Sequence, residues 1–148
     1  LPYDLVVSSK FSRNPHQIKN VHVDHIPDDS YIMDIGTSTR ENFSTNLSRF
    51  NTIIWNGPMG VYEFEPFSKG TKSVSSALAA LDATTIIGGG STAHAIQSLN
   101  LHDQITHVSS GGGAMIKFME GNELPGVSAL PIIPTQLGVH MGQNEPTR

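Results

Sequence analysis

The feature that most constrains this chain is a repeated order of segments: a short apolar run, a turn and then a helical pattern. The runs cover residues 33–35, 53–55, 84–87 and 105–109. They are rich in β-branched residues and do not alternate with polar ones, which is typical of strands covered on both faces. The fourfold repeat predicts an α/β fold, a three-layer Rossmann-like parallel sheet with right-handed crossovers and helices on both faces.

The helical patterns have recognisable ends. Ser38 and Glu41 form a capping box for a first helix. A second helix is predicted from Pro66, and Ser91 can cap a third that runs to about residue 99. A fourth ends at Gly121. Their predicted buried faces carry Phe43, Leu47 and Phe50 in the first helix and Val74, Ala77, Leu78 and Leu81 in the second.

Composition sets limits on domain number and partners. The 148 residues suffice for one domain with a real core, predicted at 1–130. Residues 131–148, with three prolines and no helical period, are predicted to form a flexible tail. A strand pattern close behind Leu1 indicates entry into a fold already under way.

Charge and residue usage exclude several functions. The net charge of −4 without a basic run argues against nucleic acid. There is no cysteine for a disulfide or a thiolate metal site, and no apolar stretch approaches a membrane span. We therefore expect a soluble protein in the cytoplasm or the chloroplast stroma.

Two glycine triplets, at 88–90 and 111–113, follow successive predicted strands. In parallel α/β sheets, ligands bind beyond the carboxyl ends of the strands. A triplet can simply form a tight turn that needs a positive φ. It can also let backbone N–H groups and a helix N-terminus approach an anion. Two triplets at neighbouring strand ends favour phosphate binding.

Three blocks resemble consecutive parts of phosphoglycerate kinase: "TIIWNGPMGVYEFEPFSKGT", "TTIIGGGST" and "HVSSGGGAMIKFMEGNELPGVSAL". "LPYDLVVSSKFS" and "IPDDSYIMDIG" resemble the two blocks that precede them in that family. The resemblance covers about 1–130 and implies part of the C-terminal, nucleotide-binding domain. It implies phosphoryl transfer between 1,3-bisphosphoglycerate and ADP, giving 3-phosphoglycerate and ATP, in glycolysis or the Calvin cycle. The N-terminal, phosphoglycerate-binding domain and the start of the C-terminal domain are expected to lie outside this chain.

The resemblance also implies contacts for the first block. Asn56 would reach the nucleotide phosphates, and Glu63 would hold the ribose hydroxyls, as a carboxylate that accepts two hydrogen bonds can. Met59 and Val61 would line the adenine pocket, with Met33 on its opposite wall. Trp55 ends a strand and is expected to pack beneath the loop, and Glu65 is expected to be a charge at a helix N-terminus.

The resemblance also implies roles for the two glycine loops. Gly89, Gly90, Ser91 and Thr92 match the loop that contacts the nucleotide phosphates. Gly111, Gly112 and Gly113 match the loop that faces the transferring phosphoryl group, where N–H groups stabilise developing charge. ATP or ADP is the expected cofactor, with Mg²⁺ carried by the nucleotide.

This chain departs from the family at two places. Ser91 stands where the family has an acid that interacts with Mg²⁺, and residues 115–117 replace a small residue and an acid with a sequence that ends in Lys117. His94, His102 and His107 show no metal-binding spacing, so no protein metal site is expected.

Three interpretations remain open. The chain is a fragment of an active phosphoglycerate kinase, monomeric at full length, or a catalytically inactive relative that binds a nucleotide or a partner. The third is an unrelated doubly wound module for another phosphorylated ligand.

Overall fold

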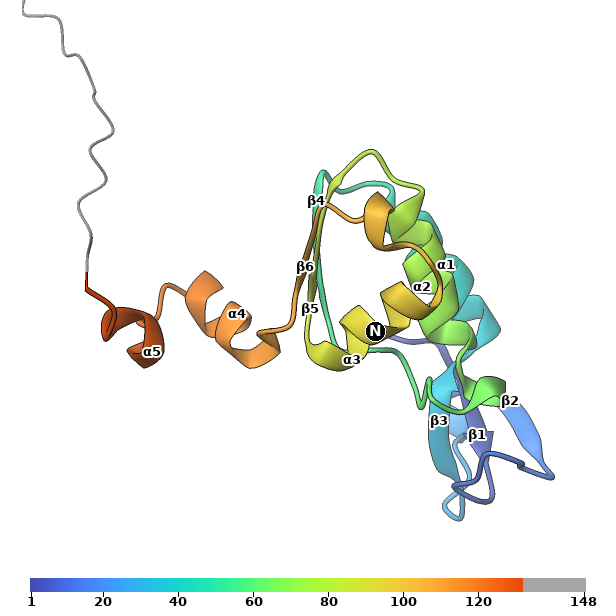
Figure 1. Ribbon diagram of the computed structural model, residues 1–148. Coiled ribbons are helices and arrows are strands. Elements are labelled where there is room, and N and C mark those ends of the chain that lie inside the picture. Colours follow the sequence, from blue (N-terminus) through green and yellow to red (C-terminus); the bar gives the residue numbers. More distant parts are fainter. Residues whose placement is uncertain (132–148) are drawn as a thin grey trace, which may run out of the picture.

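The computed structural model describes residues 1–131, which form two three-stranded sheets joined by helices (Figure 1). The predicted tail lies outside the described residues except for Pro131. One sheet contains β1 (Asp4–Ser8), β2 (Ile18–His22) and β3 (Tyr31–Ile35), and the other β4 (Thr52–Asn56), β5 (Thr84–Gly88) and β6 (His107–Ser109). The helices are α1 (Thr37–Leu47), α2 (Lys69–Ala79), α3 (Gly90–Ser98), α4 (Gly112–Met119) and α5 (Pro125–Ser128), with 3₁₀ turns η1 (Val23–His25), η2 (Glu65–Phe67) and η3 (His102–Gln104).

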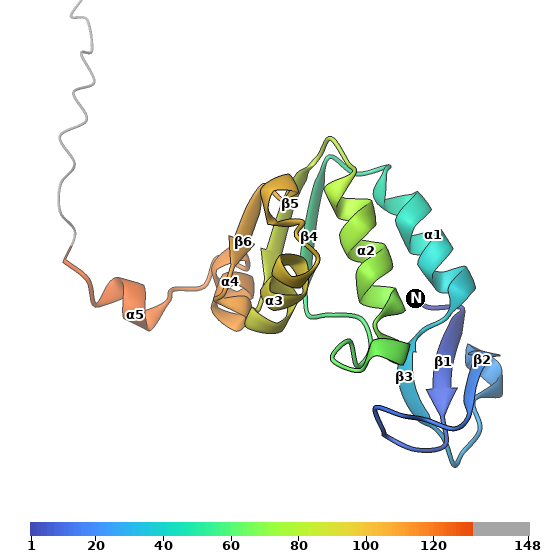
Figure 2. The same cartoon turned by 45° about the vertical axis from the view of Figure 1, so that its right-hand side comes forward.

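The second sheet is parallel, in the order β4-β5-β6, and α2 and α3 form its crossovers. Helices lie on both faces, because α4 lies on the opposite side of the sheet from α1 and α2 in both views (Figures 1 and 2). The predicted α/β class with a parallel sheet flanked by helices is therefore confirmed.

The prediction that residues 33–35 form a fourth parallel strand is wrong. These residues belong to β3, which pairs antiparallel with β1 in the separate sheet β2-β1-β3. Leu5 lies opposite Ile35, and the register shifts between Val6 and Val7. A short apolar run signals a buried strand but carries no information on the direction of its partner.

Coverage of the parallel sheet is also less complete than the apolar runs suggest. Along β4, Ile53 and Trp55 are buried, whereas Thr52, Ile54 and Asn56 are exposed. The side chain of Ile54 is 43% exposed. Within residues 1–131, α1 and α2 cover only one face of β4, so its burial alternates as in a strand with one open face.

The main core lies between the parallel sheet and α2 and α3. Leu78 and Ile87 are completely buried there, and each contributes about 1.5–3 kcal/mol by leaving water. Trp55 packs into this core at 6% exposure, as predicted, but its Nε1–H has no hydrogen-bond partner within the described residues. The core consists of Ile53, Trp55, Val74, Leu78, Ile87, Ile96 and Ile105.

The predicted helix faces are confirmed in part. Val74 and Leu78 are buried on α2, and Leu47 and Leu81 pack against the main core while partly buried. Phe50 is 58% exposed, because α1 ends at Leu47, before this residue.

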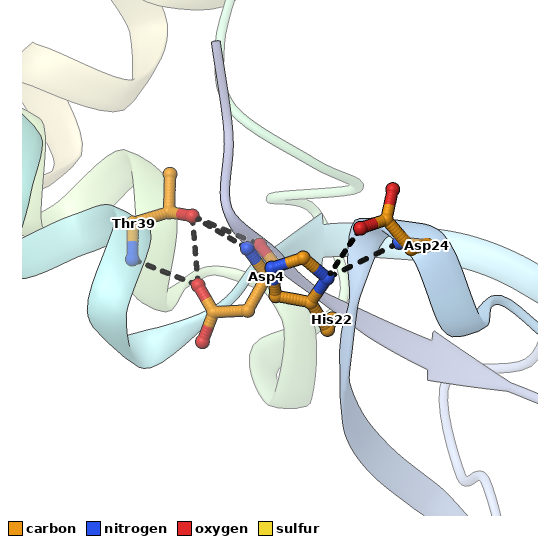
Figure 3. A network of polar contacts seen from close by, with 4 residues as sticks. All are labelled: Asp4, His22, Asp24 and Thr39. Atoms are coloured by element: carbon orange, nitrogen blue, oxygen red, sulfur yellow. Dashed lines mark hydrogen bonds and ion pairs between the residues drawn. The ribbon is translucent and has the colours of Figure 1, made fainter.

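The buried carboxylate of Asp4, in β1, caps α1 in place of the predicted capping box at Ser38 and Glu41. The helix starts at Thr37, one residue before Ser38, and its N-cap residue is Gly36. Asp4 Oδ1 accepts the Thr39 N–H at 2.8 Å and lies 2.7 Å from the Thr39 hydroxyl (Figure 3). Asp4 Oδ2 accepts the Ser38 N–H at 3.1 Å.

These contacts lower the pKa of Asp4. Burial of the carboxyl raises its pKa, but hydrogen bonds from Asn20, Thr39 and Ser38 outweigh burial and hold the pKa well below its ordinary value. The Asn20 amide donates to Asp4 Oδ2 at 2.7 Å. The first strand is therefore fixed to the start of α1 by a charge-assisted network.

Asp34 binds the start of α2 in the same way as Asp4 binds the start of α1. Its Oδ2 accepts the Gly70 N–H at 2.8 Å, and a Cβ at Gly70 would collide with the Asp34 side chain. Burial raises the pKa of Asp34, and the N–H groups of Gly70 and Ile35 together with Arg40 oppose this increase. The helix starts at Lys69 after the η2 turn rather than at Pro66.

Candidate functional site

The carboxyl ends of the three parallel strands lie side by side. Asn56 is in register with Gly88, and Gly88 with Ser109. Since α3 begins at Gly90 and α4 at Gly112, two helix N-termini start at this edge of the sheet (Figure 2). The edge therefore combines free backbone N–H groups with the positive ends of two helix dipoles.

The two glycine loops meet around the side chain of Asn56. A Cβ built on Gly88, Gly89 or Gly112 would lie 3.1, 3.0 or 3.2 Å from Asn56 Oδ1. Gly112 also backs onto Gly89, whose Cα would lie 3.0 Å from a Cβ at 112. We call Asn56 with residues 88–90 and 111–113 the glycine cradle.

The fold itself requires glycine at only some of these positions. Gly89 has φ +90°, a conformation that favours glycine, and Gly112 is held against Gly89. Gly90 and Gly113 have no positive φ, and a Cβ at either would meet open space. The tight-turn hypothesis thus explains Gly89 but leaves Gly90 and Gly113 without a structural reason, although glycine weakens a helix.

Thr92 and Ser91 take different positions at the start of α3. Thr92 is completely buried, and its hydroxyl accepts the Gly57 N–H at 3.0 Å, which ties the 56–58 turn to α3. The predicted N-cap role of Ser91 is wrong: α3 starts at Gly90, its N-cap residue is Gly89, and Ser91 is exposed in the first turn. The positive φ of Gly89 allows the helix to start directly at the end of β5.

A polar pair lies next to Ser91. The Tyr62 hydroxyl is 3.3 Å from His94 Nδ1. Burial and the nearby Glu63 raise the pKa of Tyr62, and hydrogen bonding with Ser91 opposes this increase. The 56–63 loop therefore packs across the first turn of α3 and not only against the strand end.

The three residues predicted to surround adenine pack in two different clusters. Met33 is completely buried beside Val6 and Phe67, and the Val61 N–H donates to its carbonyl at 2.8 Å. Met59 instead packs against the main core, where its carbonyl accepts the Thr71 hydroxyl at 2.7 Å. The structure brings Met33 and Val61 together and separates Met59 from them, so their contacts with a base stay predictions.

Glu63 is exposed and lines a cavity of about 210 Å³ between α2 and α3. Its backbone carbonyl accepts a hydrogen bond from Arg13 Nη1 at 3.3 Å, and the Arg13 guanidinium lies 4.9 Å from the centre of the Phe64 ring. These contacts position the backbone of the loop and leave the Glu63 carboxylate open to the cavity. The cavity is lined by Tyr62, Glu63, Glu65, Ser68, Thr71, Lys72, Ala95, Ser98 and Leu99.

Sequence reasoning noticed Met115 as unusual but missed its contact. A Cβ at Gly88 would collide with Met115 Cε and lie 3.1 Å from Met115 Sδ. The sequence did carry a signal for this contact, because Met115 is a long side chain in the first turn of α4 and helical side chains point back toward the N-terminus of their helix. Lys117 is exposed on the same helix.

Two further features of residues 1–131 bear on function. No group of three or more histidine or acidic side chains in this part of the chain could hold a metal ion. None of its helices has the length and apolar character needed to cross a membrane.

Comparison with known proteins decides the family. The family model described as phosphoglycerate kinase matches residues 1–122. The chain belongs to the phosphoglycerate kinase family. A phosphoglycerate kinase from Staphylococcus haemolyticus is 50% identical over 131 residues, which cover 88% of this chain and 33% of that protein. One from Herpetosiphon aurantiacus is 46% identical over 130 residues, with the same coverage of 88% and 33%.

Solved structures of phosphoglycerate kinases share the fold. The enzyme from Coxiella burnetii aligns with a TM-score of 0.79 and 37% identity, covering 86% of this chain and 33% of that one. The enzyme from Pyrococcus horikoshii aligns with a TM-score of 0.72 and 35% identity, covering 86% and 31%. The chain thus spans about a third of the length of the phosphoglycerate kinases it matches.

Proposed function

We propose that this chain is the nucleotide-phosphate-binding part of a phosphoglycerate kinase, and that the glycine cradle holds the phosphates of ADP and ATP. The observation that supports this most is the open space in front of Gly90 and Gly113, at two helix N-termini that converge on Asn56. Phosphate oxygens need N–H donors at close range, and only glycine lets the backbone approach them without a side chain in between.

Each part of the cradle has its own proposed task. Asn56 offers its side-chain amide to phosphate oxygens, and the N–H groups of residues 90–92 hold the phosphates at the start of α3, while the Gly89 N–H donates to the Ser109 carbonyl at 3.0 Å. Residues 111–113 face the transferring phosphoryl group, where fixed N–H donors stabilise the charge that develops during transfer. Glu63 accepts hydrogen bonds from the ribose hydroxyls. Met33, Met59 and Val61 are proposed for the base, and for Met33 this requires exposure of a side chain that is buried here.

Mg²⁺ fits this site less well than phosphate does. The residue in the first turn of α3 is Ser91, whose hydroxyl is neutral, whereas hard divalent cations prefer carboxylate oxygens. We therefore propose that Mg²⁺ arrives with the nucleotide and gains little from position 91.

The full reaction is proposed for the longer protein. It transfers a phosphoryl group between 1,3-bisphosphoglycerate and ADP, giving 3-phosphoglycerate and ATP. Because such transfer relies on positioning both substrates, we expect no turnover from the 148 residues alone. ATP formation from 1,3-bisphosphoglycerate by the purified chain would contradict this expectation.

The proposed cellular location, pathway and oligomeric state follow from the family. We propose a cytoplasmic glycolytic enzyme that is monomeric at full length. The sequence relatives from Staphylococcus haemolyticus and Herpetosiphon aurantiacus come from bacteria, and nothing supports the chloroplast stroma. The alternative of an inactive relative rests on Ser91 and Lys117 alone, and no observation on the described residues favours it.

The proposal is tested by Glu63→Ala. If Glu63 holds the ribose, the substitution weakens ADP binding by about 1.5–3 kcal/mol, the range for a hydrogen bond with a charged group. Binding of inorganic phosphate, which has no ribose, stays unchanged. Glu41→Ala is the matched control, since Glu41 is an exposed acid on α1 and its loss changes the net charge equally. Equal ADP affinities of the Glu63→Ala and Glu41→Ala chains by calorimetry would return Glu63 to a solvated surface acid.

A further inference from the structure

Met115 places an apolar group inside the glycine cradle. Its N–H donates to the Gly111 carbonyl at 2.8 Å, so the residue closes the first turn of α4. From there its side chain reaches back to Gly88, where its methyl group overlaps the position that a Cβ would take and its sulfur lies 3.1 Å from that position. Asn56 Oδ1 lies 3.1 Å from that same position. The end of Met115 and the amide of Asn56 therefore share the space above Gly88.

The side chain of Asn56 makes no hydrogen bond with any residue in the range 1–131 and is exposed at the end of β4. An amide has two donors and two acceptor positions, so contact with a methyl group leaves this capacity unused. Oδ1, the acceptor end of the amide, faces this space, and a half-turn of the amide would bring Nδ2–H₂ there, from which a phosphate oxygen can accept a hydrogen bond. After this half-turn the space next to Asn56 suits an anion, whereas the methyl group of Met115 offers the amide no hydrogen-bond partner.

Met115 is also a side chain that can leave. Methionine is unbranched, has three rotatable bonds and fills irregular gaps without a single preferred shape. Met115 is only partly buried, so other rotamers reach solvent. The rest of the cradle consists of backbone and the short side chain of Asn56, so Met115 is the long side chain that can clear this space by changing rotamer.

We propose that Met115 is a gate of the phosphate site. In the free chain its methyl group covers Gly88 and Asn56, and it turns away when a phosphate oxygen of a nucleoside diphosphate or triphosphate binds the Asn56 amide. This inference rests on the proposed function, because it assigns a regulatory side chain to the same cradle.

The affinity test uses four forms of the 148-residue chain with ADP in calorimetry. Met115→Ala removes the gate and binds ADP about fourfold more tightly, the factor for one methyl group that no longer has to be returned to water when ADP binds. Met119→Ala, one turn further on α4 and 43% exposed, is the matched control and leaves the affinity unchanged. In the Met115→Ala/Asn56→Ala double variant the gain is lost, since the uncovered amide is absent.

A spectroscopic measurement separates gating from a merely structural role. With methyl-labelled methionine, saturating ADP shifts the Met115 ε-methyl resonance toward that of an exposed methionine, while that of Met119 moves little. Equal ADP affinity of the wild-type and Met115→Ala chains, with an unmoved Met115 resonance, would overturn the gate and leave the proposed function intact. If no form binds ADP, the proposed function and the gate both fail.

Discussion

Alanine substitutions in the glycine cradle separate the requirements of the fold from those of the ligand. At Gly90 the backbone is helical and a Cβ meets open space. Gly90→Ala should therefore raise the free energy of unfolding by about 0.5 kcal/mol, roughly half of the Gly-to-Ala difference inside a helix, since the position is terminal. The same methyl group points into the proposed phosphate position. We expect ADP affinity to fall at least about tenfold, or about 1.4 kcal/mol.

Gly89→Ala is expected to lower the stability of the chain, whereas Gly90→Ala raises it. Its φ of +90° is unfavourable for alanine, and the new Cβ lies 3.0 Å from Asn56 Oδ1. The conformational cost alone is about 1–3 kcal/mol of stability, the range for a residue forced into a sparsely populated backbone region. Gly126→Ala in α5 provides the control, because its Cβ also meets open space and α5 lies away from the cradle (Figure 1). It should leave ADP affinity unchanged.

Urea unfolding followed by circular dichroism gives the stabilities, and calorimetry with ADP gives the affinities. The combination of a more stable chain with weaker ADP binding is expected for Gly90→Ala alone among these three. Unchanged ADP affinity in a folded Gly90→Ala chain would show that no phosphate approaches Gly90, and would refute the reasoning for the cradle.

Two further predictions concern the Asp4 cap of α1 and position 91 in the first turn of α3. Asp4 has a lowered pKa, so the stability it contributes is fully present above its unfolded pKa of about 3.9 and is lost as the pH falls toward its folded value. Asp4→Asn keeps one of the two acceptor oxygens, so it should cost about 1.5–3 kcal/mol of stability at pH 7. It should also reduce the loss of stability below pH 4, which urea midpoints at pH 7 and pH 3 will show. If the variant loses stability in acid as steeply as the wild-type chain, Asp4 is not the source of that loss. Ser91→Asp should strengthen binding of Mg²⁺–ADP and weaken binding of metal-free ADP, because a carboxylate attracts the ion and repels bare phosphates. Titrations with and without Mg²⁺ that change by the same factor would mean that position 91 does not face the metal.

The glycine edge could be predicted from sequence because its signals are local. Each triplet directly follows an apolar run, and parallel strands must bring their carboxyl ends to one edge, so Gly88 and Ser109 were bound to become neighbours once the sheet was parallel. Trp55 was likewise predictable, since a large apolar residue at a buried strand end packs inward.

The features that sequence reasoning missed depend on residues far apart in the chain. The start of α1 is capped by Asp4, which lies 35 positions before Thr39, so the local Ser38–Glu41 pattern was a coincidence of residue types. The antiparallel pairing of β3 depends on β1 in the same way. The burial of Met33 under Val61 follows from how the 57–61 loop crosses β3, and no periodicity in the sequence records that crossing.

The central claim, that the glycine cradle binds nucleotide phosphates, is tested most directly by amide chemical shifts. The ¹⁵N-labelled chain is titrated with ADP and, separately, with adenosine. Our account predicts that ADP shifts the backbone amides of residues 89–92 and 111–113 most, and that adenosine leaves them nearly unchanged because it carries no phosphate. If ADP instead moves the amides of β1 and β2 most, or if adenosine reproduces the ADP shifts at residues 89–92, the phosphates do not bind in the cradle.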